Sequence, residues 1–293
     1  VVTHGAIGAN ALVHETMIAP GDHVISICPT YQQHYSIPES FGAKLDILWL
    51  RPENDFLPDL KELESMLRPN TKLVVLNNPN NPTGALLMGP NLEEFVAVVR
   101  SSGAYILCDE VYRGTNQVGN GFAPAMADIY EKGISVSSMS KVFSLAGIRL
   151  GWIAAPREVL EAVSIRRDYN TISVGMIDDY FASLALENKE KIIGRSQKIT
   201  RGNLKILDDW VSKERSISYK KPQAGTTALL KYDFDIPSRE FCIQLLRETG
   251  VMFTPGSVME MEGWLRIGYA NSPEVLSQGL DLVSNFLLQM GSR

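Results

Sequence analysis

The stretch Leu73–Gly84 reads LVVLNNPNNPTG, an apolar run followed directly by a polar one. Its first part, Leu73–Leu76, has the composition of a strand that is buried on both faces of a sheet. Its second part, Asn77–Gly84, consists mainly of asparagine, proline and glycine, which are common turn formers. We therefore predict a buried strand that ends in a polar turn.

The same order of an apolar run and a polar segment recurs in the first half of the chain. Further predicted strands are Val24–Ile27, Lys44–Leu50, Tyr105–Cys108, Ile134–Ser137 and Gly151–Ala155. Helical patterns lie between several of them, at Ala9–Ile18, Leu60–Leu67 and Leu92–Ser102. This alternation predicts an α/β fold with a mostly parallel sheet and helices on both faces.

The pattern changes beyond residue 156. Residues 156–213 read as largely helical, with Gly194 and Gly202 as the points where a helix is weakest. The remaining chain mixes strands at Ile217–Tyr219, Thr227–Lys231, Val251–Phe253 and Trp264–Gly268 with helices at Ser238–Glu248 and Pro273–Met290. We predict a large domain over residues 1–205 and a smaller α+β domain over residues 206–293. Because the chain opens within an apparent strand-loop-helix unit, we expect a preceding N-terminal segment in a longer protein.

Composition narrows the class of protein. Hydrophobic residues make up 45% of the 293 residues, and charged residues make up 21%. The net charge of −5 does not favour binding to nucleic acid or to anionic lipid. No apolar run approaches the roughly 20 residues that cross a bilayer. Cys28, Cys108 and Cys242 are widely spaced and odd in number, which is typical of free thiols in the cytoplasm.

Polar side chains follow three of the predicted strands, where open α/β sheets bind their ligands. The segments are Asn77–Gly84, Asp109–Arg113 and Ser138–Arg149. Each segment alone is compatible with a turn, a solvated strand end or a surface lysine. Together they bring amides, a carboxylate, a phenol, a lysine and an arginine to one edge. That combination favours a site for an anionic, aromatic cofactor.

At these segments the chain resembles the class I/II aminotransferases of pyridoxal 5′-phosphate (PLP) fold type I, the aspartate aminotransferase superfamily. The matching motifs are NNPNNPTG (77–84), DEVYR (109–113), SMSKVFSLAGIRLGW (138–152) and WLRIGYA (264–270), in the family's order. The resemblance extends over essentially the whole chain. It implies PLP as cofactor, an amino acid and a 2-oxo acid as substrates, and a homodimer.

The resemblance also implies a role for individual residues. Lys141 is the Schiff-base lysine and later the general base, and Asp109 is the partner of the pyridine nitrogen. Asn81 and Tyr112 contact the phenolic oxygen, with Tyr112 among the catalytic residues. The phosphate is bound by Ser138, Arg149 and the backbone of Gly5, Ala6 and Ile7, while Tyr31 stacks on the ring. Arg266, with Asn81, binds the substrate's α-carboxylate.

Several alternatives remain at this point. The same residues serve a β-lyase or an amino-acid cyclase or oxidase, and Pro29–Tyr35 resembles PLP enzymes of arginine derivatives, such as capreomycidine synthase. A third class is the effector-binding module of a transcription regulator, although no basic winged-helix segment is present. We predict no metal site, since His14-Glu15 lacks the second histidine of a zinc-protease motif. We expect His4, His14, His23 and His34 to be core or surface residues.

Overall fold

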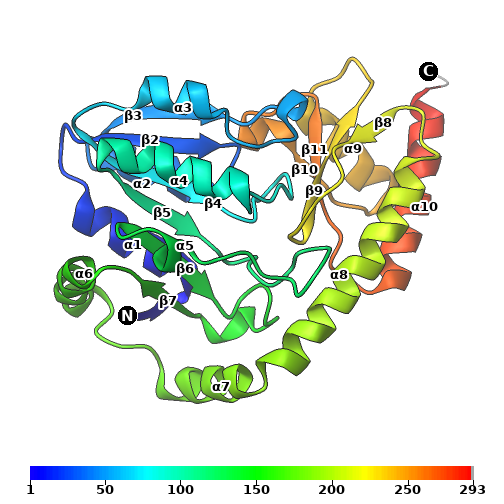
Figure 1. Cartoon of the computed structure of the whole chain (residues 1–293). Helices are drawn as coiled ribbons and strands as arrows, with labels where there is room; N and C mark the ends of the chain where they lie inside the picture. The colour runs from blue at the N-terminus through cyan, green and yellow to red at the C-terminus, as the bar shows by residue number, and fades with distance from the viewer. Residues whose placement is uncertain (292–293) are drawn as a thin grey trace.

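The computed structural model describes residues 1–291, and their strands form two separate sheets (Figure 1). In these residues the larger sheet has seven strands, in the order β1-β7-β6-β5-β4-β2-β3. They are β1 Val2–His4, β2 His23–Cys28, β3 Lys44–Trp49, β4 Thr71–Asn77, β5 Tyr105–Asp109, β6 Gly133–Ser138 and β7 Leu150–Ala154. Strands β2 to β6 are parallel, whereas β7 is antiparallel to β6 and β1 to β7. The predicted α/β fold with a mostly parallel sheet is confirmed.

Helices cover both faces of this sheet (Figure 1). They are α1 Gly5–Met17, α2 Gln33–Ser40, α3 Leu60–Met66, α4 Pro90–Ser102, the short α5 Met126–Ile129 and α6 Arg157–Asn170. Strand β4 shows why both faces are covered. Its Leu73 and Val75 belong to the core under α1 and α6, whereas its Val74 and Leu76 belong to the core under α3 and α4. The apolar run in the sequence therefore reflects burial on both sides.

The smaller sheet has four antiparallel strands in the described residues, in the order β10-β11-β9-β8. They are β8 Ile217–Tyr219, β9 Thr227–Tyr232, β10 Thr254–Pro255 and β11 Trp264–Gly268. Helices α9 Ser238–Thr249 and α10 Pro273–Met290 pack with it around a core of their own. Helix α9 ends at Gly250, whose left-handed backbone (φ 74°) closes the helix.

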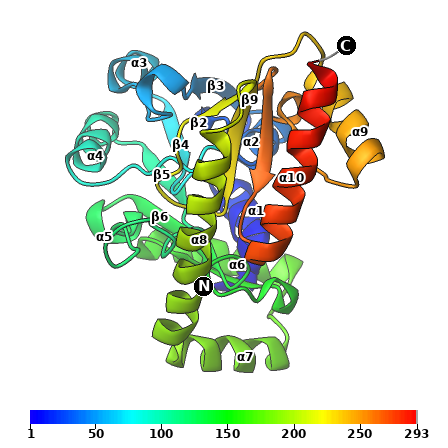
Figure 2. The same cartoon turned by 90° about the vertical axis from the view of Figure 1, so that its right-hand side faces the viewer.

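Two helices connect the sheets, α7 Met176–Glu187 and α8 Lys189–Val211, and α8 runs beside α10 (Figures 1 and 2). Gly194 and Gly202, predicted as the points where a helix is weakest, do not interrupt it, because α8 continues through both. Two glycines cost about 2 kcal/mol relative to alanine, and the burial of α8 side chains such as Leu204 and Leu207 outweighs that cost. The helical region is interrupted instead at residues 171–175 and at Asn188. The predicted domain boundary near residue 205 falls inside α8 and stays a prediction.

Other departures concern short elements. Residues 251–253 form no strand. This segment pairs with β11 only at the next two residues, Thr254 and Pro255, while Phe253 is buried in the core of the smaller sheet. An apolar side chain buried at a loop gives the same sequence signal as a strand. Helix α1 begins at Gly5 rather than at Ala9, and β1 and α2 were not predicted.

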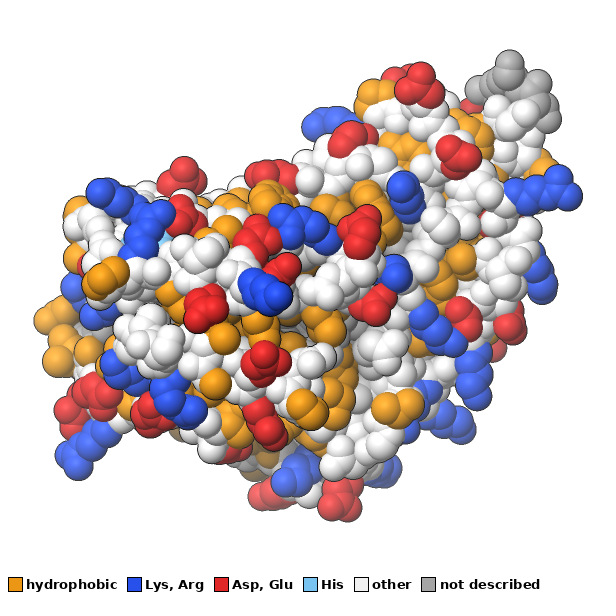
Figure 3. Space-filling model, turned by 45° about the horizontal axis from the view of Figure 1, so that its top comes forward, with side chains coloured by type: hydrophobic (Ala, Val, Ile, Leu, Met, Phe, Trp, Pro, Cys, Tyr) orange, Lys and Arg blue, Asp and Glu red, His pale blue; other side chains and the backbone are white. Residues whose placement is uncertain are grey.

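The surface carries mixed charge. Figure 3 shows Lys, Arg, Asp and Glu side chains interspersed over the face that carries α3 and α4. Among residues 1–291, no helix combines the length and the apolar character that a membrane span requires.

Candidate active site

A cavity of about 650 Å³ lies where the polar segments after β4, β5 and β6 face β9 and β11. All but one of the predicted site residues line it: Ala6, Ile7, Tyr31, Asn81, Asp109, Tyr112, Ser138, Lys141, Arg149 and Arg266. The exception is Gly5, which directly precedes the lining residue Ala6 in the chain. Residues from both sheets therefore contribute to one site.

Gly5 begins α1 with a left-handed backbone (φ +66°). A Cβ atom at this position would lie 2.7 Å from Nη2 of Arg149, so only glycine lets the guanidinium approach. Ala6 and Ile7 follow in the first helical turn, where backbone N–H groups have no partner within the helix. A guanidinium beside the first turn of a helix makes this end of the cavity a site for an anion such as phosphate.

Two hydrogen bonds fix the guanidinium of Arg149. Its Nη1 donates to the carbonyl oxygen of Ala146 at 2.7 Å and to Oγ of Ser140 at 3.3 Å. Its backbone is left-handed (φ 49°), which is uncommon for a residue other than glycine. Ser138, at the end of β6, is buried, and its Oγ accepts from the backbone N–H of Ser140. Hydroxyl and guanidinium groups thus lie at the same end of the cavity.

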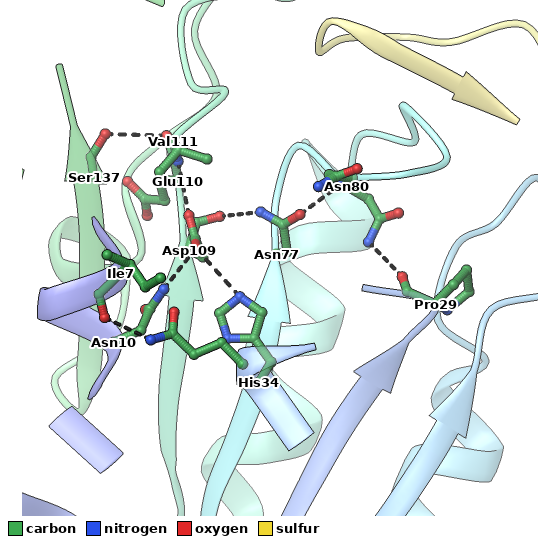
Figure 4. A network of polar contacts seen from close by, with 12 residues as sticks. Ile7, Asn10, Pro29, His34, Asn77, Asn80, Asp109, Glu110, Val111 and Ser137 are labelled. Carbon is green, nitrogen blue, oxygen red and sulfur yellow. Dashed lines mark hydrogen bonds and ion pairs between the residues drawn. The ribbon is translucent and has the colours of Figure 1, made fainter. Parts of the chain in front are cut away.

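Asp109 is the last residue of β5 and is 5% exposed (Figure 4). Its Oδ2 accepts from Nδ2 of Asn10 at 2.8 Å and lies 3.3 Å from Nε2 of His34. Its Oδ1 accepts from the backbone N–H of Val111 at 3.1 Å. Among the ion pairs of residues 1–291, no lysine or arginine is paired with this carboxylate. A buried carboxylate without a cation is suited to a ligand that carries positive charge.

Lys141 follows β6 by three residues, and its amine lies 5.8 Å from the centre of the Tyr112 ring. Burial lowers the pKa of the amine, and the positive charge of Arg266 lowers it further, while Asp109 acts in the opposite direction. A lowered pKa increases the fraction of neutral amine, which is the nucleophilic form. The Tyr112 hydroxyl has a raised pKa because it is buried, and a hydrogen bond with Thr226 partly offsets that shift.

Arg266 lies on β11 and reaches across to the larger sheet. Its Nη1 donates to Oδ1 of Asn81 at 3.3 Å, and its Nη2 donates to Oγ1 of Thr254 at 3.2 Å. The backbone N–H of Asn81 in turn donates to Oδ1 of Asn77 at 2.7 Å, and Nδ2 of Asn77 donates to the Asp109 carbonyl at 2.8 Å. A chain of hydrogen bonds thus connects the guanidinium with the strand end that carries Asp109, and Figure 4 shows its contact between Asn77 and Asp109.

Sequence reasoning missed some of these residues. His34 was expected in the core or on the surface; it is buried, and it lies beside Asp109. Asn10 was not singled out, although a polar residue on the buried face of a helix was a usable signal. Thr226 and Thr227 line the cavity from the start of β9. No motif marks them, because their position depends on how the two sheets face each other.

The cavity fits PLP. It offers an amine for an aldehyde, a carboxylate without a cation for a protonated ring nitrogen, and a guanidinium at a helix start for a phosphate. A second guanidinium, that of Arg266, remains for another anion.

The fold and this site together define a PLP-dependent transferase of fold type I. The chain belongs to the family described as aminotransferase class I and II, whose sequence profile matches residues 1–281. The confirmed features are therefore the family, PLP as cofactor and enzymatic transfer of an amino group.

Individual relatives are consistent with this assignment. The chain is 30% identical to capreomycidine synthase of Streptomyces vinaceus, over 98% of this chain and 74% of that relative. It is 29% identical to aspartate aminotransferase of Thermotoga maritima, over 98% of this chain and 75% of that enzyme. The crystal structure of a PLP-dependent aminotransferase from Streptococcus suis superposes with a TM-score of 0.95 at 45% identity, covering 99% of this chain and 77% of the other.

Proposed function

We propose that this enzyme moves the amino group of an α-amino acid to a 2-oxo acid and that Lys141 binds the aldehyde carbon of PLP covalently. The observation that carries the proposal is the position of the Lys141 amine, in one cavity with Asp109 and two arginines. When bound, PLP supplies a ring that accepts the electron pair released at the substrate's α-carbon.

The other predicted residues would hold the cofactor. Arg149, Ser138 and the first N–H groups of α1 would bind the phosphate, because they gather at one end of the cavity. The Asp109 carboxylate would accept a hydrogen bond from the ring nitrogen and keep it protonated. Asn81 and Tyr112 would donate to the phenolic oxygen. Tyr31, which lines the cavity and is 47% exposed, would stack on one face of the cofactor.

Lys141 would also move the proton. With the substrate bound to the cofactor in its place, the lysine amine would be free to take the proton from the α-carbon. A base at this position must be neutral, which the lowered pKa of Lys141 favours. Lys141 would deliver that proton to the cofactor rather than back to the α-carbon; water would then release the 2-oxo acid, and a second 2-oxo acid would accept the amino group by the reverse sequence.

The substrate would be held by its α-carboxylate on Arg266. Asn81 and Thr254 fix the two amino groups of that guanidinium, which orients it for a second, bidentate partner. Relatives named for aspartate and for N-acetyl-LL-diaminopimelate aminotransferase activity support an α-amino acid as the substrate class.

A second candidate is cyclisation of an arginine derivative. The similarity to capreomycidine synthase and the Pro29–Tyr35 segment favour it. A panel of amino acids, including arginine derivatives, is incubated with the PLP-loaded enzyme with and without a 2-oxo acid. Transamination consumes the added 2-oxo acid and releases no ammonia. Elimination releases ammonia and leaves the added 2-oxo acid unchanged. A cyclised product that forms without ammonia release and without consumption of the 2-oxo acid would contradict transamination and support cyclisation.

We further propose that the enzyme is a homodimer. The end of α6, the following loop and α7 carry several exposed large apolar side chains, namely Tyr169, Ile172, Met176, Ile177 and Tyr180. Large apolar side chains that gather on a surface are typical of protein–protein contact sites. Sedimentation should give twice the chain mass, and Ile177→Glu with Tyr180→Glu should give a monomer. Met252→Glu, an exposed apolar position on the smaller part, is the matched control; a monomeric wild type would contradict the proposal.

We also propose a cytoplasmic location. Cys28, Cys108 and Cys242 are buried free thiols, which suits a reducing compartment. Fractionation of cells that express the protein tests it, and recovery outside the cytoplasm would contradict it.

A further inference from the structure

We propose that Asn10 is a positioning residue that holds the Asp109 carboxylate in place, so that helix α1 aligns both ends of the cofactor. The proposal rests on the proposed function, in which Asp109 binds the ring nitrogen and the start of α1 binds the phosphate. It goes beyond that function because no motif of the family used above includes Asn10.

The contact between the two side chains is short and buried. Asn10 is 1% exposed, and its Nδ2 lies 2.8 Å from Oδ2 of Asp109 (Figure 4). The second side chain at this oxygen, His34, lies farther away, with 3.3 Å between Nε2 and Oδ2. The amide of Asn10 is therefore the closest side-chain donor to the carboxylate.

The surroundings of Asn10 indicate that this one contact is why the position is polar. Its helix neighbours Ala9, Leu12 and Val13 all belong to an apolar core. The other half of its amide, Oδ1, is buried and has no hydrogen-bond partner among residues 1–291. An unpaired buried oxygen is unfavourable, so a leucine would suit the packing better. The hydrogen bond to Asp109 is the gain that offsets this cost.

A neutral donor is the appropriate chemistry here. The amide stabilises the carboxylate by a hydrogen bond but does not cancel its charge, which remains available for a protonated ring nitrogen. A lysine or arginine at residue 10 would pair with Asp109 and compete with that nitrogen. His14, one turn farther along α1, adds no charge, because burial and then the proximity of His34 lower its pKa to about 3.

The same helix begins at the other end of the cavity. Ala6 and Ile7 line the cavity from the first turn of α1, and Asn10 lines it from the next turn. Asn10 lies four positions after Ala6 in the helix, a fixed rise of about 6 Å. A single rigid element thus presents backbone donors to the phosphate and sets the orientation of the carboxylate that meets the ring.

Three variants of the PLP-loaded enzyme test the proposal. Asn10→Leu removes the donor at similar volume. Asn10→Asp keeps the shape but places a second carboxyl beside Asp109. Leu12→Ala weakens the packing of α1 at a neighbouring buried position and leaves the donor in place, so it is the matched control for a purely structural effect.

The expected results differ for each variant. Asn10→Leu should lower kcat and weaken the equilibrium binding of PLP to the cofactor-free protein, each by about tenfold, since a hydrogen bond to a charged group contributes about that much. Asn10→Asp should approach wild-type kcat at low pH, where its protonated carboxyl donates to Asp109. Its kcat should then fall more steeply than that of the wild type as pH rises, because two adjacent carboxylates repel each other. Leu12→Ala should lower the melting temperature but leave PLP binding and the pH profile unchanged.

Two outcomes would overturn the proposal. One is an Asn10→Asp enzyme with the pH profile of the wild type, and the other is a loss in Asn10→Leu that Leu12→Ala reproduces. Borohydride reduction and peptide mapping distinguish a failure of the Asn10 proposal from a failure of the proposed function. If PLP does not label Lys141 in the wild type, the proposed function fails; if it does and the variants behave like the wild type, only the role of Asn10 fails.

Discussion

Replacing Arg266 by lysine tests how the substrate's carboxylate is bound. The guanidinium donates to Asn81 with one amino group and to Thr254 with the other, at 3.3 and 3.2 Å. Its plane is therefore fixed before a substrate arrives. A lysine amine keeps the positive charge but is a single point, so it cannot offer two parallel hydrogen bonds to a carboxylate.

In Arg266→Lys, the substrate's carboxylate would lose one of its two charge-assisted hydrogen bonds. Such a bond contributes about 1.5–3 kcal/mol, which corresponds to a roughly 10- to 100-fold weaker binding of the amino acid. The resting enzyme should change little, because the positive charge of residue 266 still lowers the pKa of the Lys141 amine. Arg266→Met removes that charge and should raise the Lys141 pKa, since Arg266 is the largest cause of its lowering after burial.

The assay is the rate of the first half-reaction, measured in a single turnover as a function of amino-acid concentration. A primary amine with the same side chain but no carboxylate is the control substrate. We expect Arg266→Lys to raise the concentration needed for half-maximal rate with the amino acid and to affect the amine far less. A separate pH titration of the cofactor-free protein compares the Lys141 pKa in Arg266→Met and in the wild type. Equal losses for the amine and the amino acid would refute carboxylate binding by Arg266.

Three further predictions concern ionisable residues, namely Lys141, Asp109 and Glu110. Lys141→Ala should fold and still bind PLP noncovalently but lose turnover, and borohydride reduction should label Lys141 in the wild type and no residue in the variant; labelling of another lysine would contradict the assignment. Asp109→Ala should lower kcat by roughly 10²–10³-fold, because an unpaired buried charge costs about 3–5 kcal/mol; wild-type turnover in the folded variant would disprove the role. Glu110 is buried beside Asp109, and burial raises its pKa from 4.5 to about 7. The folded protein therefore binds this proton more tightly than the unfolded chain, and the free energy of unfolding should fall by about 3 kcal/mol as pH rises from about 4.5 to above 7. The free energy of unfolding, measured by urea denaturation at several pH values, should lack this fall in Glu110→Gln. The same dependence of that free energy on pH in the variant and the wild type would refute the prediction.

Much of the fold was predictable because the order of residues within short segments determines its strands and helices. The apolar run before Asn77 predicts a strand buried on both faces, and in the structure its residues alternate between two cores. Asp109 and Lys141 were found for the same reason, since a polar residue at the end of such a strand points to the ligand edge of the sheet. These inferences need only the order of residues within a short segment.

What was missed depends on packing between distant segments. Asn10 and His34 reach Asp109 only because α1 and α2 pack together behind β5, and no periodicity in either segment indicates that contact. The continuity of α8 likewise depends on tertiary burial, which overrides the low helix propensity of Gly202. At Phe253 the error is of a different kind, because a buried loop and a strand give the same apolar signal.

Helix α8 connects the surroundings of Lys141 with those of Arg266. Its first half is bonded to the turn after β6, where Oγ of Ser196 donates to the carbonyl of Val142, the residue after Lys141. Its second half is embedded in the other core through Leu207 and Trp210. The helix is a stiff rod of 23 residues, about 34 Å long. One continuous helix therefore contacts both the turn that holds Lys141 and the core under the sheet that carries Arg266.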